Sequence, residues 1–284
     1  MVQITHKQTG AVLATVDGDS LVGADLRDMR LNGADLVGAD LSNANLEFTD
    51  LVAADLGGAS LRGASLLSAH LNDADLSGAD LARVRAGSNR TANAAVFTGA
   101  NLSRANLEGA DLRNAELRNA NLQQANLRYA DMRGTDFSHS NLSHVTAPKG
   151  LFIQANLRSA DLCGADLRDC HLNDANLAKA SLYDADLSSA QPDGFTVVNL
   201  ANFEGADLHD AKLCNVSAQD ANFRNANLSH VDFSHAVLGG AILRGANVAG
   251  ADFSDVELAS VTMEFANFSK AKNAKVPSYK QNLR

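Results

Sequence analysis

The sequence predicts an all-β solenoid, a β-helix with four-sided coils, and three observations predict it. Leu recurs at every fifth residue over long stretches, beginning with Leu21, Leu26 and Leu31. Ala usually stands two residues before that Leu, with Asp, Asn or Ser between them, as in GADLVGADLSNANL. Hydrophobic residues make up 45% of the chain, but aromatic residues only 5%, and Trp is absent. A core of Leu and Ala with few rings indicates a narrow, regular interior.

The five-residue period explains the local structure that we expect. It matches neither the period of an α-helix nor that of a plain strand. Within each unit the small residue and the Leu are two positions apart, so both point to the same side of a short extended segment. The other residues are mostly Gly, Asn, Asp, Ser and Arg, and most of these favour turns. Each unit is therefore predicted to be a very short strand followed by a corner, and four corners close a coil of about 20 residues.

The repeats fill most of the chain. The period runs through residues 21–81, 97–187 and 203–268, which gives about 46 units. Residues 19–270 are therefore the predicted solenoid, with about 12–13 coils. Side chains of one kind recur 20 positions apart, as the coil requires: Asp35, Asp55 and Asp75, Phe203 with Phe223, and Phe233 with Phe253.

These A-(D/N)-L-x-x units resemble the pentapeptide-repeat family over about 90% of the chain. The resemblance implies a right-handed quadrilateral β-helix that acts by binding. It also implies a more specific role, because some members of the family resemble a DNA duplex in shape and charge. Those members regulate DNA gyrase or protect it from inhibitors.

Both ends and two internal segments depart from the repeat. Residues 1–18 are predicted to form a β-hairpin cap around a turn at Lys7–Gly10, and residues 271–284 a basic tail, with a helix as the alternative. The repeat phase shifts by one residue at two breaks, which predicts loops near 82–95 and 188–201. Such loops either carry function or are tolerated insertions. A third irregular segment, SHVTAPKGLFIQ, keeps the phase, and its Pro148 and Gly150 predict one distorted corner.

No catalytic, cofactor-binding or metal-ligating set is expected. The 33 acidic residues stand mostly before Leu, where turn stabilisation and solubility explain them better than acid–base catalysis does. The two histidine pairs lack the further ligands that a metal needs: His139 with His144, and His230 with His235.

The cysteines and the chain start bear on location. Cys170 replaces an inward Ala, while Cys163 and Cys214 follow Leu and should point outward. Three cysteines without CxxC spacing fit a reducing compartment. With neither a signal-peptide pattern nor an apolar run long enough for a membrane span, we expect a cytoplasmic protein without membrane association.

Charge frames the functional hypotheses. The net charge of −9 disfavours direct nucleic-acid binding. Residues 19–81 hold 11 acids and 3 bases, residues 97–187 hold 11 and 9, and residues 203–268 hold 9 and 3.

The leading hypothesis is a non-enzymatic scaffold for an unknown protein partner. The alternative is a DNA-mimicking regulator or protector of DNA gyrase or topoisomerase, and a third hypothesis is an ordered spacer. The candidate interaction surface comprises one acidic column and the arginines of the first predicted loop: Asp35, Asp55, Asp75, Arg83, Arg85 and Arg90.

Overall fold

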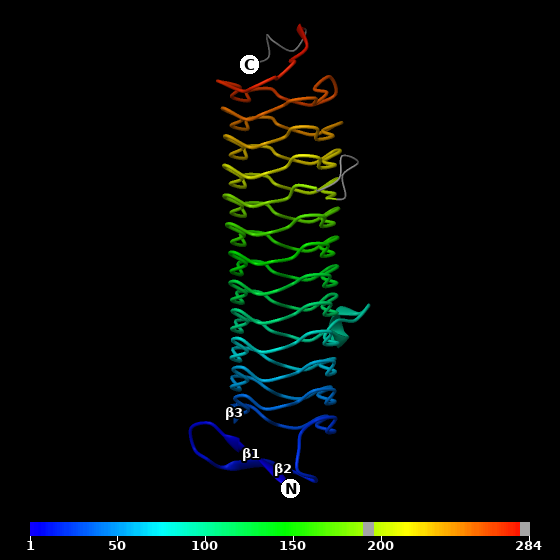
Figure 1. The fold of residues 1–284 in the computed structure, drawn as a ribbon, viewed down its shortest axis with the longest axis vertical. Coiled ribbons are helices and arrows are strands. Elements are labelled where there is room, and N and C mark those ends of the chain that lie inside the picture. Colours follow the sequence, from blue (N-terminus) through cyan, green and yellow to red (C-terminus); the bar gives the residue numbers. More distant parts are fainter. Residues whose placement is uncertain (190–195, 279–284) are drawn as a thin grey trace. The chain divides into compact units, whose positions relative to one another are not determined.

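The computed structural model describes residues 1–189 and 196–278 of the 284-residue chain. The chain forms two compact units, residues 1–142 and 143–284. Each unit is a stack of short extended segments joined by turns (Figure 1). The described elements longer than a single bridge are β1 (Val2–His6), β2 (Val12–Val16), β3 (Ala34–Asp35) and the 3-10 helix η1 (Thr91–Asn93). Within the described residues, no helix is long and apolar enough to span a membrane.

Parallel β-bridges build each unit coil by coil. In the first unit, four successive bridges join residues 20 positions apart: Asp25 with Asn45, Arg30 with Asp50, Asp35 with Asp55, and Asp40 with Ser60. The second unit repeats this spacing, as in Asp161 with Ser181 and Asp166 with Asp186. The predicted all-β solenoid is therefore confirmed.

One repeat unit, around Asn45, shows how apolar side chains are buried while the backbone forms its hydrogen bonds. Ala44 and Leu46 are 1% and 0% exposed, whereas Asn45 between them is only half-buried. The Asn45 N–H donates to the Ala24 carbonyl of the coil before at 2.9 Å, and the Leu46 N–H donates to the Ser65 carbonyl of the coil after at 2.8 Å. Each short segment therefore bonds to both neighbouring coils and turns its apolar side chains inward.

Most of the corners are type II turns. The Ala24 N–H donates to the Leu21 carbonyl at 3.1 Å, and Gly23, the third residue of the turn, has a φ of 66°. This i to i+3 bond with positive φ at the third position defines the turn type and explains why Gly and Asn are frequent there. Some corners place bulky residues in the same conformation, such as Phe48 with a φ of 60°. The surrounding stack must supply the free energy that holds those residues in the left-handed region.

The corner at Pro148 differs from the sequence-based expectation. The Gly150 N–H donates to the Ala147 carbonyl at 2.9 Å, and Lys149 has a φ of 61°, as in the other corners. Pro148 occupies the second position of the turn, where its fixed φ is favoured. Gly150 takes the place of the small inward residue and is buried. The expectation of a distorted corner is wrong, because this turn type already accommodates proline.

A hairpin covers the interior at the start of the first unit. β1 pairs antiparallel with both β2 and β3, with Thr5 opposite Asp35 in the second pairing. Ile4 of β1 is 1% exposed, so it continues the core. The His6 ring lies against Gly33, where an added Cβ would come within 2.6 Å of its Nε2. The antiparallel pairing of β1 thus satisfies backbone hydrogen-bonding groups at one edge of the first coils. It also covers apolar surface at the end of the solenoid that would otherwise be exposed to solvent.

Aromatic rings fill part of the second unit's core. Phe203 stacks on Phe223 with centroids 4.9 Å apart, and Phe233 stacks on Phe253 with centroids 5.5 Å apart. These are the two pairs that the 20-residue separation predicts, and they are confirmed.

The turn type gives a testable consequence at two adjacent glycines. Gly58 has a φ of 64° and an added Cβ there would meet no neighbouring atom, whereas Gly57 has no positive φ. Gly58→Ala should lower the free energy of unfolding by about 1 kcal/mol, because only the left-handed backbone penalises the new side chain. Gly58→Asn should lower it less. Gly57→Ala should also lower it less than Gly58→Ala does, because its Cβ would meet Asp55 Oδ1 at 3.2 Å but the backbone would carry no left-handed strain. Chemical denaturation measures all three, and equal effects of the two alanine variants would contradict the assignment.

Candidate interaction surface

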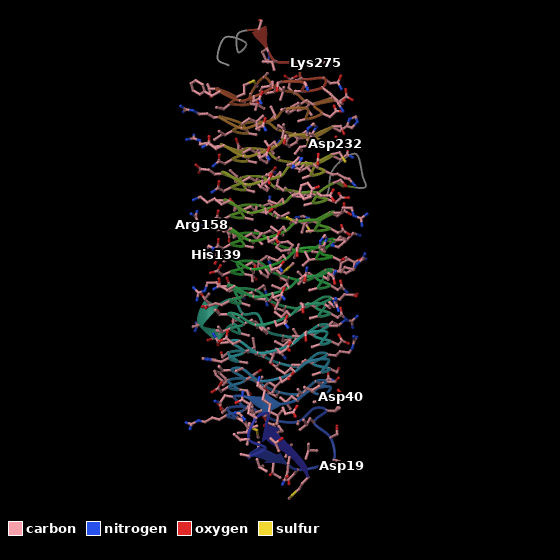
Figure 2. All side chains as sticks on the ribbon, turned by 90° about the vertical axis from the view of Figure 1, so that its left-hand side faces the viewer. Asp19, Asp40, His139, Arg158, Asp232 and Lys275 are labelled. Carbon is pink, nitrogen blue, oxygen red and sulfur yellow. The ribbon has the colours of Figure 1, made fainter. Side chains whose placement is uncertain are left out.

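The stacked coils place the predicted acidic residues in one column. Charged side chains project outward from the coils, as at Asp40 in the first unit and Asp232 in the second (Figure 2). Bridges link Asp35 to Asp55 and Asp55 to Asp75, so the structure brings these three together.

The acidic side chains also stabilise the turns that follow them. Oδ1 of Asp55 accepts the Gly57 N–H at 3.1 Å, and Oδ1 of Asp75 accepts the Ser77 N–H at 2.9 Å. This contact between a side chain and the backbone two residues on explains why Asp and Asn precede the Leu. Part of each carboxylate is therefore committed to the fold.

Within the first unit, asparagines replace aspartates in this column after Asp75. Asp75 bridges to Asn101, and Asn101 bridges to Asn121. Asn101 Nδ2 donates to Asp75 Oδ1 at 3.0 Å, and Asn121 Nδ2 donates to Asn101 Oδ1 at 3.2 Å. A ladder of neutral amides thus continues the acidic column. The sequence hides this junction, because Asp75 and Asn101 are 26 residues apart rather than 20.

Most arginines in the middle of the sequence are neutralised locally by the acid two residues earlier. Arg113 donates to Asp111 through Nε at 2.9 Å and Nη2 at 2.7 Å. Burial favours the protonated form of Asp111, but the Arg113 hydrogen bonds and charge outweigh it and hold the pKa of that carboxyl below its ordinary value. The same pairing recurs in other repeats: Arg27 with Asp25, Arg118 with Glu116, Arg133 with Asp131 and Arg168 with Asp166.

The first insertion begins later than the sequence indicates. Arg85 still bridges to Ser65 and Asp111, and Ala86 is buried in the core. Arg83 lies in an ordinary corner with a φ of 57°. Regular coil therefore extends through Ala86, and the residues that leave it are 87–94. The phase shift locates an interruption, but it cannot show how many flanking residues stay in the coil.

Hydrogen bonds to the next coil fix the inserted segment. The Ser88 N–H donates to the Arg113 carbonyl at 2.9 Å, and Arg113 Nη1 donates to Asn89 Oδ1 at 2.7 Å. At Gly87 an added Cβ would lie 2.2 Å from the Arg113 backbone nitrogen, so only glycine permits this approach. The Ala95 N–H donates to the Ala86 carbonyl at 2.8 Å and closes the segment.

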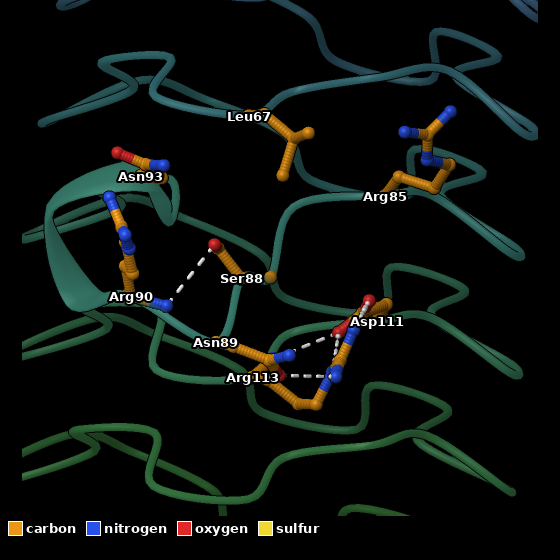
Figure 3. A pocket seen from close by; sticks show the side chains of 9 residues that line it. Leu67, Arg85, Ser88, Asn89, Arg90, Asn93, Asp111 and Arg113 are labelled. Atoms are coloured by element: carbon orange, nitrogen blue, oxygen red, sulfur yellow. Dashed lines mark hydrogen bonds and ion pairs between the residues drawn. The ribbon is translucent and has the colours of Figure 1, made fainter.

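The inserted segment and the adjacent coils enclose an open recess, which we call the arginine recess. Its volume is about 440 Å³, and its lining is mostly polar: Leu67, Arg85, Gly87, Ser88, Asn89, Arg90, Asn93, Asp111 and Arg113 (Figure 3). Figure 3 shows Arg90 on the inserted segment and Arg85 on the coil, with Leu67 and Ser88 between them in this view. Two of the three predicted arginines thus line one recess, whereas Arg83 and the acidic column do not. Only the structure reveals Arg113 and Asn93 as part of it.

The second predicted loop, near 188–201, falls partly on residues 190–195, which lie outside the described residues. Ser189 Oγ donates to Asp169 Oδ1 at 3.0 Å before that gap. Thr196 Oγ1 donates to the Ser188 carbonyl at 3.1 Å and accepts the Asp169 N–H at 2.7 Å after it. The predicted basic tail is described only as far as residue 278.

The cysteines and histidines offer little for chemistry. Cys170 is buried at an inward position as predicted, its Sγ contacts the Ala147 carbonyl at 2.9 Å, and burial raises the pKa of its thiol. Burial also raises the pKa of the half-buried Cys163 and Cys214. A raised pKa lowers the thiolate fraction and hence the reactivity. In the described part of the chain, no three His, Cys, Asp or Glu residues converge to hold a metal ion.

Comparison with known families decides the relationship. The profile of the family described as Pentapeptide repeats matches in 8 copies, over residues 20–58, 49–85, 93–128, 115–146, 152–190, 201–245 and 238–272. This chain belongs to the pentapeptide-repeat family. The resemblance seen in the sequence is thereby confirmed.

Solved structures of other pentapeptide-repeat proteins are similar to it. HetL, involved in heterocyst differentiation regulation in Nostoc sp. strain PCC 7120, is 26% identical, with 88% of this chain and 87% of HetL covered and a TM-score of 0.37. QnrB1, a plasmid-mediated fluoroquinolone resistance protein, is 16% identical, with 88% and 91% covered and a TM-score of 0.32. Rfr23 from Cyanothece 51142 is 22% identical, with 38% and 63% covered and a TM-score of 0.23. No curated protein matches this chain.

The Asp111–Arg113 pair gives a pH-dependent prediction for this pentapeptide-repeat chain. The folded-state pKa of Asp111 lies below its ordinary value of 3.8, so the ionised pair stabilises the fold above that pH and the benefit disappears as the pH falls through the folded-state pKa. Asp111→Asn should therefore lower the free energy of unfolding by about 1 kcal/mol at pH 7, and the difference from wild type should shrink below about pH 4.

Denaturation from pH 7 to pH 3 measures this difference. The matched control is Asp161→Asn, since Asp161 accepts the Cys163 N–H, bridges to Ser181 and forms no ion pair among the described residues. A deficit for Asp111→Asn that stayed constant across this range would contradict the role of the ion pair.

Proposed function

We propose that this pentapeptide-repeat chain is a non-enzymatic scaffold that docks a protein partner along the faces of a right-handed, four-sided coil. The observation that carries the proposal is the alignment of outward side chains, which bridges between successive coils hold in straight columns such as Asp35, Asp55 and Asp75. Four bridges per 20 residues support the four-sided form. The handedness rests on membership of the family.

Rigidity of the columns supports docking. In the second unit, Asn222 Nδ2 donates to Asn202 Oδ1 at 2.9 Å, and Asn202 Nδ2 donates to Asn176 Oδ1 at 3.4 Å. In the column beside it, Asn227 Nδ2 donates to Asp207 Oδ1 at 2.8 Å. Side chains already ordered in such ladders lose little conformational freedom when a partner binds, so more of the contact energy appears as affinity.

The state of the reactive groups supports a role without catalysis. The carboxylates of Asp55 and Asp75 accept backbone N–H groups of the following turns. Cys170 is buried, and the pKa of its thiol is raised. The three cysteines are free thiols, which supports a reducing, cytoplasmic location.

Site-specific photo-crosslinking in the source cells tests the scaffold. A benzophenone side chain placed in turn at Asn45, Asp50, Asp55 and Ser60 probes the four columns of the same coils without touching the core. Docking on one face predicts that one of these positions crosslinks a defined protein at least about fivefold more than the position on the opposite face, since interfaces occupy only about a tenth of a protein's surface. Equal, diffuse labelling from every column would contradict a docking face.

A second candidate function is DNA mimicry toward gyrase or topoisomerase, and the acidic column favours it. Coil spacing places its carboxylates about 4.8 Å apart, and phosphates on one DNA strand follow each other every 3.4 Å or so along the axis. The run of carboxylates that could mimic phosphates is short, because Asn101 follows Asp75 in the column. Local pairs such as Arg113 with Asp111 also reduce the negative field in the first unit.

A gyrase supercoiling assay, with and without a quinolone, tests the second candidate. If the column stands in for phosphates, wild-type protein should inhibit or protect the enzyme at concentrations below about 1 µM, and neutralising the three carboxylates should weaken the effect about tenfold or more. The triple variant Asp35→Asn, Asp55→Asn, Asp75→Asn keeps oxygen acceptors for the turns while removing the charge. The absence of any effect at tens of micromolar wild-type protein would exclude this function.

A further inference from the structure

We propose that the arginine recess binds an oxyanion, a phosphate or a carboxylate group, through Arg85 and Arg90. This inference goes beyond the proposed function, because a small anion can bind there whether or not a protein docks on the coil faces.

Charge in the arginine recess is unbalanced. Three guanidinium groups line it, and the only carboxylate in the lining is that of Asp111. Both oxygens of Asp111 accept hydrogen bonds from Arg113. Glu47, one coil beyond Leu67, accepts a hydrogen bond from Ser65 Oγ at 2.7 Å. Within the described residues, Arg85 and Arg90 have no acidic partner, so two positive charges remain available in a chain of net charge −9.

The arginine recess is held open by fixed contacts. Asn114 Nδ2 donates to the Ser88 carbonyl at 2.8 Å, and the Ser68 N–H donates to the Asn93 carbonyl at 3.0 Å. The Arg90 N–H donates to Ser88 Oγ at 3.2 Å, and the Asn93 N–H donates to the Arg90 carbonyl at 2.9 Å within the turn of η1. The segment that carries Arg90 is therefore positioned before any ligand arrives, which lowers the entropic cost of binding.

The available donors suit an oxyanion. Guanidinium groups bind phosphate and carboxylate oxygens through paired, charge-assisted hydrogen bonds. The Asn93 side chain also lines the recess, and its amide can add a neutral donor. The volume of about 440 Å³ exceeds the space that a single phosphate needs, so the recess can also admit the group to which the oxyanion is attached.

Isothermal titration calorimetry of the full chain with pyrophosphate and, separately, with citrate tests this proposal at low ionic strength, where exposed charges act most strongly. Pyrophosphate probes the phosphate class, and citrate probes the carboxylate class. We expect at least one of them to bind wild type. Arg85→Ala and Arg90→Ala should each weaken that binding about tenfold, the usual loss for one charge-assisted contact. Lysine at the same positions should weaken it less, because charge is kept and the fork is lost.

Arg128→Ala is the matched control, since Arg128 is an exposed arginine of the first unit that does not line the recess. Its binding should equal that of wild type. Binding that weakens only at Arg85 and Arg90 supports the proposal and identifies the anion class. The proposal is overturned if neither anion binds, or if all three alanine variants lose affinity equally. Unchanged thermal unfolding of the variants ensures that lost binding does not reflect lost folding.

Discussion

Backbone hydrogen bonds between residues 20 positions apart are the constraint on which the other features depend. The Leu46 N–H donates to the Ser65 carbonyl, and the Asn45 N–H donates to the Ala24 carbonyl. Each short extended segment therefore satisfies its backbone polar groups through the coils on either side of it. The same bonds set the positions of Ala and Leu inside and of Asp and Asn outside. The register between coils therefore determines both which residues form the core and which form the surface columns. In a globular domain without repeats, no single register determines both.

Much of the fold could be predicted because the same pattern of inward and outward residues recurs in every repeat unit. The inward placement of Cys170 and the pairing of Phe203 with Phe223 follow from counting in steps of five and 20. The regular corner at Pro148 could not be predicted in this way, because the turn type, with its own place for proline, is a matter of dihedral angles that spacing does not reveal. The extent of the first insertion could not be predicted either, because Arg85 and Ala86 look like loop residues and yet keep coil contacts.

The candidate surface is predictable only in part. Column geometry follows from the period, so the spacing of Asp35, Asp55 and Asp75 is enough to group them. The arginine recess cannot be predicted in the same way, since Arg113 and Asp111 come from the coil after the insertion and meet it through a close approach at Gly87. Contacts made by an irregular segment depend on where its backbone folds back, and no periodic pattern contains that information.

The first insertion shows how a repeat chain can gain residues without losing its order. His70 bridges to Val96 across 26 positions, and Val96 bridges to Glu116 across the usual 20, so six extra residues are absorbed at one corner and the next coil resumes in register. A corner is therefore a site where evolution or design can add a peptide of new sequence while every other coil keeps its place. Segments inserted at corners can then vary in sequence while the core of the coil stays unchanged.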